Sequence, residues 1–149
     1  MIGLLQRVSS ASVAVDGEEI ATISTGLLVL VGVERGDSER QAERLAERLL
    51  NYRVFGDSDG KMNLSVTDTG GSVLLVPQFT LAADTTSGNR PGFSSTADPA
   101  TGRQLFDQLV AAMQQRGLTV VTGQFGANMQ VSLCNEGPVT FSLRVPPPG

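Results

Sequence analysis

The segment "NEGPVTF", residues 135–141, is an unusual candidate for a functional site. It lies between two runs typical of strands, "MQVSLC" and "VTFSLRV". Because proline cannot donate to a sheet ladder, Gly137–Pro138 predicts a break, a bulge or a more specialised structure. The chain also has no histidine, the side chain that most often transfers protons in hydrolases. Any catalysis must therefore proceed without one.

A second candidate is "PQFTL", in which Gln78 and Thr80 follow an apolar strand pattern and precede a long polar loop. Functional sites are frequent where strand ends meet loops. The structural alternative is that Thr80 satisfies a neighbouring backbone group. Arg7, within "LLQRV", is equally compatible with the solvated face of a strand. The residues alone leave these alternatives open.

Two further residue patterns favour structural interpretations. "SDGK", residues 58–61, matches the Ser-x-x-Lys pattern of some acyl-transfer enzymes, but its Asp and Gly residues favour a turn. A Ser–Lys hydrolase based on Ser58 and Lys61 is the weaker hypothesis. Cys134 lies in an apolar run without a basic partner, which predicts a buried side chain.

Composition limits the classes of function. With 149 residues, 40% of them hydrophobic, the chain fits a single domain over residues 1–145, followed by a disordered tail, "PPPG", at 146–149. One cysteine without histidine excludes an internal disulfide and an ordinary zinc site, and no cofactor motif is present. The net charge of −4 argues against broad binding of nucleic acid. No apolar run approaches the ~20 residues that span a bilayer, so we expect a cytoplasmic protein without membrane contact.

The predicted elements combine strands with two helices. Strand patterns alternate with turns in the first third of the chain, including Asp16–Gly17. One amphipathic helix begins at Asp37 or Ser38, and another at Asp98 or Thr101. Because the helices do not alternate strictly with the strands, the pattern favours an α+β fold with a barrel-like β-sheet core and two flanking helices.

Two segments resemble the signatures of bacterial D-aminoacyl-tRNA deacylases, Ser-Gln-Phe-Thr-Leu and Asn-x-Gly-Pro-Val-Thr. These are "PQFTLAADTTSGNRPGF", residues 77–93, and "NEGPVTF". Further similarity runs through "LLQRVSSASVAVDG", "GLLVLVGVERGD", "DGKMNLSV" and "TGQFGANMQVSL", and so covers nearly the whole chain. The resemblance implies a homodimer that needs no cofactor. It implies hydrolysis of the ester between a D-amino acid, or glycine, and the 3′ adenosine of tRNA.

The resemblance also implies roles for individual residues. Gly137–Pro138 would form a cis peptide that reaches into the partner's pocket, where its carbonyls exclude an L side chain. Arg7 would fix the orientation of this peptide. The main chain of Phe79 and Thr80 would stabilise the oxyanion, with Gln78 beside them in the catalytic set and the substrate's 2′-hydroxyl assisting. No base is visible to activate Thr80 as a nucleophile, so we assign it to positioning.

The chain departs from the family pattern at two positions. Pro77 stands where the family has serine, which removes one backbone donor beside the pocket, and Gly92 replaces the serine of Arg-Pro-Ser-Phe. A sister branch with another chiral preference also begins the motif with Pro-Gln, but Phe79 and "GPVT" match the D-specific branch. The alternative function is a module of the same fold that binds an RNA 3′ end or nucleotide without hydrolysis.

Overall fold

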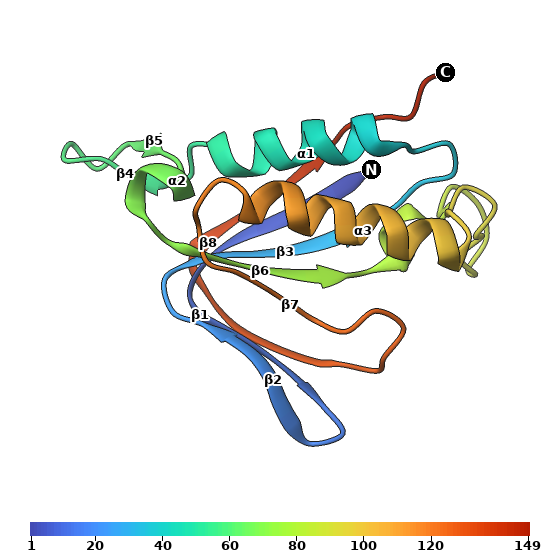
Figure 1. The fold of residues 1–149 in the computed structure, drawn as a ribbon, viewed down its shortest axis with the longest axis horizontal. Helices are drawn as coiled ribbons and strands as arrows, with labels where there is room; N and C mark the ends of the chain where they lie inside the picture. Colours follow the sequence, from blue (N-terminus) through green and yellow to red (C-terminus); the bar gives the residue numbers. More distant parts are fainter.

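A long first strand, paired along both of its edges, organises the computed structural model, which describes residues 1–149 (Figure 1). The elements in chain order are β1 (Ile2–Val15), β2 (Glu18–Ile23), β3 (Gly26–Gly32), α1 (Glu39–Asn51), β4 (Phe55–Gly56), β5 (Met62–Leu64), α2 (Val66–Thr69), β6 (Ser72–Pro77), the 3₁₀ helix η1 (Phe79–Ala82), α3 (Pro99–Gln114), β7 (Val120–Thr122) and β8 (Gln130–Arg144).

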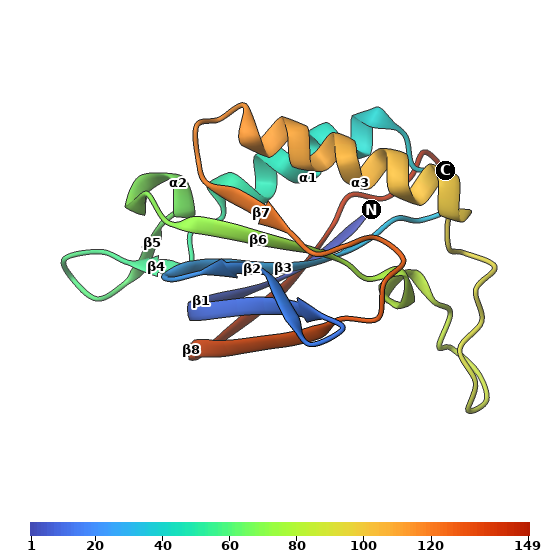
Figure 2. The same cartoon turned by 60° about the horizontal axis from the view of Figure 1, so that its bottom comes forward.

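The main sheet is mixed and strongly curved (Figure 2). The first half of β1 pairs with β3, its second half pairs with β2, and its other edge pairs with β8, all antiparallel. Strand β6 lies parallel to β3 and to β7. The strand order is β2-β1-β3-β6-β7, and β2 also contacts β6 and β7. These contacts curl the sheet toward a closed barrel.

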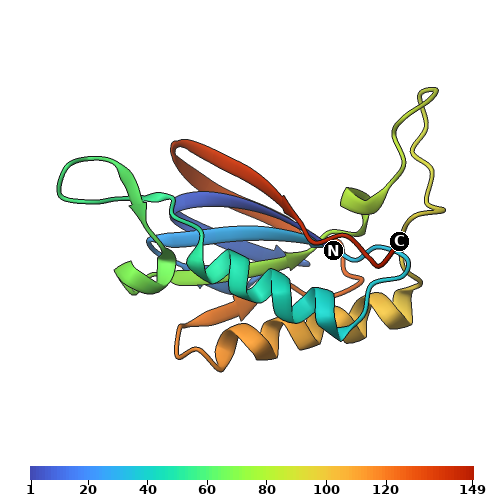
Figure 3. The same ribbon diagram turned by 90° about the horizontal axis from the view of Figure 1, so that it is seen from above.

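Helices α1 and α3 lie side by side on one outer face of the sheet (Figures 1 and 3). Of the two residues predicted to begin the first helix, Ser38 is the cap, and its N–H donates to Gln41 Oε1 at 2.8 Å. Asp98 caps α3, where its Oδ2 accepts from the N–H of Thr101 at 3.1 Å. None of the helices has the length and apolar composition needed to cross a membrane.

Strands β3 and β6 are buried on both faces, which explains their continuous apolar sequences. Alternate residues of β3, such as Leu27 and Val29, face a core of 24 buried residues under the helices. Leu28 belongs instead to a second cluster of eight buried residues, enclosed by the curved sheet. The predicted α+β fold with a barrel-like sheet and flanking helices is therefore confirmed, and the short helix α2 is an addition to it.

Strand β8 differs from the prediction because most of its side chains are exposed. Cys134, which we expected to be buried, is exposed, and so is Ser10, its partner across the ladder. Leu133 and Phe141 in the same strand are 38% and 37% exposed. The prediction for Cys134 was wrong because an apolar strand pattern does not indicate which face of the strand the rest of the chain covers.

The first residue is tied to the loop before α1. The Met1 ammonium donates to Glu34 Oε2 at 3.0 Å and to Asp37 Oδ1 at 2.9 Å, and Arg144 pairs with Glu34 at 2.9 Å. Burial disfavours the charged form of both carboxyls, an effect that acts to raise the pKa of each. For Glu34, the hydrogen bonds from Arg144 and the ammonium outweigh burial, and its pKa lies below the ordinary value. For Asp37, burial prevails and the pKa is raised.

Candidate active site

Strand β6 ends at Pro77, and the chain turns directly into η1. The N–H of Gln78 donates to the carbonyl of Val31 at 2.8 Å, which extends the pairing with β3 by one residue. Helix η1 then begins at Phe79, whose side chain is 58% exposed. The first N–H groups of a helix have no acceptor within it. The main chain of Phe79 and Thr80 therefore provides donors at the point where β6 opens into a loop.

The Thr80 hydroxyl is held by its neighbour Gln78, whose Nε2 donates to Thr80 Oγ1. An amide that donates a hydrogen bond to a hydroxyl cannot remove its proton. This arrangement fixes the hydroxyl without activating it as a nucleophile.

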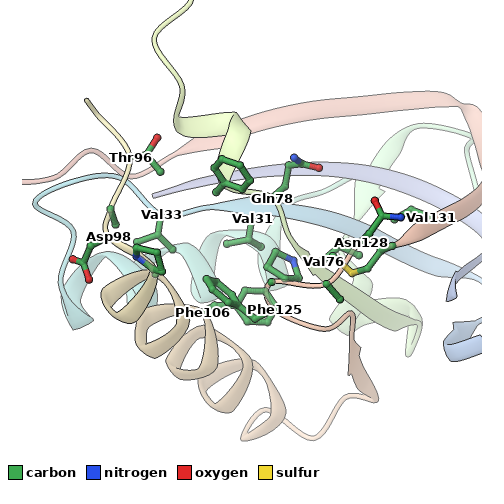
Figure 4. Close-up of a pocket in the computed structure, with 18 residues that line it drawn as sticks. Val31, Val33, Val76, Gln78, Thr96, Asp98, Phe106, Phe125, Asn128 and Val131 are labelled. Carbon is green, nitrogen blue, oxygen red and sulfur yellow. The ribbon is translucent and has the colours of Figure 1, made fainter. Parts of the chain in front are cut away.

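A cavity of about 490 Å³ lies beside this turn (Figure 4). Strands β3 and β6 form one wall, and α3 and the segment 125–129 form the other. Ten of the 18 lining residues are hydrophobic, including Phe106 and Phe125. The cavity thus has the size and the apolar character of a site for a flat organic ring, with Gln78 and Phe79 at its border.

Few polar groups line this cavity. Asp98 is the single charged residue among them, and the hydrogen bonds from Thr101 lower the pKa of its carboxyl. Thr96 also lines the cavity, and its Oγ1 is buried without a hydrogen-bond partner. Since buried polar atoms are usually satisfied, the Thr96 hydroxyl is available to a bound molecule.

The turn at Gly137–Pro138 contains a cis peptide and is held by Arg7. Arg7 Nε donates to the carbonyl of Glu136 at 3.0 Å, and its Nη1 donates to the carbonyl of Val54 at 2.7 Å. Gly137 has a φ of +139°, and a Cβ there would lie 2.9 Å from the N of Val139. Glycine is therefore required at this position.

Asn135 forms a second clamp on the same turn. Its Oδ1 accepts from the N–H of Val139 at 3.0 Å, and its Nδ2 donates to Thr140 Oγ1 at 2.8 Å. The side chain thus connects the two arms that flank Gly137–Pro138. Together with Arg7, it fixes this turn from both sides.

The structure brings the predicted site residues together as two separate groups. Gln78 and Phe79 border the cavity, with Thr80 held beside them. Arg7 and Gly137–Pro138 contact each other but do not line it. Arg7 pairs with Leu27 of β3, four residues before the cavity-lining Val31, or about 13 Å along the strand. Within a single chain, the two groups of site residues therefore lie apart.

Other residues of interest either escaped the sequence analysis or lie elsewhere. Thr96 and Phe125 line the cavity. Phe125 lies in "TGQFGANMQVSL", for which the resemblance implied no residue role, and Thr96 belongs to no recognised pattern. Asn135 is the first residue of "NEGPVTF", and its position in that motif was the available signal. Ser58 and Lys61 lie in the turn between β4 and β5, where Asp57 Oδ1 accepts from the N–H groups of Asp59 and Lys61. This agrees with the turn interpretation.

Comparison with known sequences finds similarity to one family of proteins over nearly the full length of the chain. A family model described as D-Tyr-tRNA(Tyr) deacylase matches residues 4–144. The chain is 60% identical over 147 residues to the D-aminoacyl-tRNA deacylase of Methylococcus capsulatus, which covers 99% of this chain and 96% of the relative. It is also 60% identical over 148 residues to the D-aminoacyl-tRNA deacylase of Thioalkalivibrio sulfidiphilus, covering 99% of each.

Two solved structures share the fold. A protein described as c-Myc DNA Unwinding Element Binding Protein superposes with a TM-score of 0.93 at 36% identity, covering 98% of this chain and 99% of that one. A probable eukaryotic D-amino acid tRNA deacylase superposes with a TM-score of 0.79 at 17% identity, covering 95% and 98%. The second likeness concerns the fold alone.

Proposed function

This chain belongs to the D-Tyr-tRNA(Tyr) deacylase family, and we propose that it hydrolyses the ester between a D-amino acid, or glycine, and the 3′ end of tRNA. The observation that carries this proposal is the apolar cavity bordered by the first residues of η1. A terminal adenosine fits a cavity of this size and character, and its aminoacyl ester then lies at the main chain of Phe79 and Thr80.

The chemistry requires no histidine. An aminoacyl ester is already reactive, and attack by water creates negative charge on the carbonyl oxygen. Preorganised backbone N–H groups stabilise that charge, and we assign this role to Phe79 and Thr80. Gln78 holds the Thr80 hydroxyl in place, so Thr80 positions the site and the substrate's 2′-hydroxyl assists the attack.

The turn at Gly137–Pro138 acts as the chiral filter. Main-chain atoms cannot move aside as side chains can, so rigid backbone excludes an L side chain by a steric clash. Glycine has no side chain to clash and passes the same filter. The contacts of Arg7 and Asn135 support this role because they hold the turn on both sides.

A homodimer supplies the filter to the site. Within one chain, Gly137–Pro138 lies outside the cavity, and the exposed apolar side chains of β8, including Leu133 and Phe141, offer a surface for a second copy. A two-fold axis then places each turn at the partner's cavity. We further propose that the protein acts in the cytoplasm, where its tRNA substrate takes part in translation.

One assay tests the function. Purified protein is incubated with D-Tyr-tRNA, L-Tyr-tRNA and Gly-tRNA, and the released amino acid is measured. We expect release from the D and glycyl esters and retention of the L ester. The alternative, a binding module, would leave the D ester intact while still competing for tRNA. The weaker Ser–Lys hypothesis predicts that Lys61→Ala loses activity, whereas our proposal predicts that Lys61→Ala keeps wild-type activity.

A further inference from the structure

Phe125 lines two neighbouring cavities. On one side lies the cavity of about 490 Å³ that we assign to the terminal adenosine. On the other lies a second hollow of about 390 Å³ between α3 and the segment that follows β7. Phe106 and Phe125 line both, but Phe106 is held in the middle of α3. The width of the substrate cavity therefore depends on where the segment around Phe125 rests.

Three contacts from α3 hold Phe125 in position. The ring lies directly against the helix at Gly102, where a Cβ would be 3.4 Å from Phe125 Cζ. The Arg103 guanidinium lies over the ring, with Cζ 5.4 Å from the ring centroid. Arg103 Nη2 also donates to the carbonyl of Phe125 at 3.4 Å. One exposed arginine thus binds both the side chain and the main chain of Phe125, which lines both cavities.

We propose that Arg103 is a positioning residue that sets the shape of the substrate cavity by fixing Phe125 against α3. The inference rests on the proposed function, because the cavity matters only if the substrate occupies it. The planar guanidinium suits the task, since it can stack on an aromatic face while one of its N–H groups donates. Without it, the Phe125 ring is free to move toward the second hollow.

The effect should fall on substrate binding and leave the chemical step unchanged. Phe125 lies beside Phe106 on the wall formed by α3 and the 125–129 segment, whereas Gln78, which precedes the main chain of Phe79 where the ester reacts, follows β6 in the other wall (Figure 4). Loss of a contact that is equal in the ground state and the transition state raises KM without lowering kcat. An exposed cation over an aromatic ring accounts for a change of about two- to fivefold.

The test compares single and double variants in deacylation of D-Tyr-tRNA. We expect Arg103→Ala to raise KM about two- to fivefold, with kcat and the melting midpoint unchanged, and Arg103→Lys to restore part of the loss. In a Phe125→Leu background, Arg103→Ala should have a clearly smaller effect, because the ring is gone and only the bond to the main-chain carbonyl remains. Arg116→Ala removes the same charge from an exposed residue beyond the end of α3 and should behave as wild type.

Each contrary result has a distinct meaning. An Arg103→Ala variant with wild-type KM would overturn the inference. A rise in KM of undiminished size in the Phe125→Leu background would also overturn it, since Arg103 would then act without the Phe125 ring. Failure of the wild-type protein to release any D-amino acid would instead refute the proposed function itself.

Discussion

Arg7 donates through Nε to the carbonyl of Glu136 at 3.0 Å, and that carbonyl directly precedes the Gly137–Pro138 peptide. The same guanidinium reaches the carbonyl of Val54 through Nη1 at 2.7 Å. The turn is therefore tied to the segment after α1 by two donors held in one plane, an arrangement that a lysine ammonium cannot reproduce.

Arg7→Lys should consequently lower kcat/KM for D-Tyr-tRNA roughly tenfold, which corresponds to one lost hydrogen bond from a charged donor. The preference for D over L esters should fall as well, because the turn loses its fixed orientation. Steady-state kinetics on both esters measure the effect. Arg53→Lys is the matched control, since Arg53 is exposed and contacts Asn63 at 3.1 Å. Equal kinetics of the two variants would refute the role of Arg7.

Asn135 provides an independent test of the same turn. Asn135→Ala removes the acceptor of the Val139 N–H and the donor to Thr140, and we expect a loss of activity of about tenfold. Asn135→Asp keeps an acceptor for Val139 and can accept from the Thr140 hydroxyl, so it should retain most activity. If alanine is tolerated as well as aspartate, the clamp has no functional importance.

The oxyanion role of the main chain can be tested by deleting one N–H group. Phe79→Pro removes that donor at the first position of η1, where proline fits a helix, and Gln78, with φ −140° and ψ 84°, lies outside the α region that a following proline disfavours. We expect kcat to fall by about 10² to 10³. Phe79→Leu keeps the N–H and should remain active. Similar rates for Phe79→Pro and Phe79→Leu would exclude a catalytic N–H at this position. Separately, an amino acid found covalently bound to Thr80 would exclude the positioning role of Thr80.

The ion pairs of Glu34 predict a defined pH dependence of stability. Because the pKa of Glu34 is lower in the folded protein, its contribution is complete above its ordinary pKa of 4.5 and is lost as the pH falls through the folded value. Glu34→Gln should therefore reduce the free energy of unfolding at pH 7 by about 1 to 3 kcal/mol, and the difference from wild type should shrink below pH 4. Urea unfolding of both proteins measures it. A difference that stays constant down to pH 3 would contradict this account.

Local signals in the sequence identified the elements whose structure is determined locally. Asp16–Gly17 forms the predicted turn with φ angles of 51° and 81°, and Ser38 and Asp98 cap helices where the pattern placed them. The environment of Cys134 could not be predicted in this way, because the apolar residues of β8 do not distinguish a core from an uncovered face. Arg103 and Phe125 meet across 22 residues of chain, and no periodic pattern connects them.

The final prediction concerns the two groups of site residues that one chain keeps apart. Gly137→Ala places a Cβ 2.7 Å from Val139 Cγ2 and so disrupts the turn, whereas Phe79→Pro damages the cavity side of the site. Each variant alone should be nearly inactive. In a hybrid dimer that contains one chain of each kind, the Gly137→Ala chain keeps an intact cavity and the Phe79→Pro chain keeps an intact turn.

The activity of the hybrid dimer shows whether the turn acts on its own chain or on its partner. If it acts on the partner, the chain with Gly137→Ala keeps an intact cavity and receives the intact turn of the Phe79→Pro chain. Hybrid dimers, isolated by two different affinity tags after co-expression, should then regain about half of the wild-type activity, since one of two equivalent sites is complete. If the turn acts within its own chain, every site carries one defect and the hybrid stays inactive. An inactive hybrid of normal dimeric mass would therefore refute the transfer of Gly137–Pro138 between subunits.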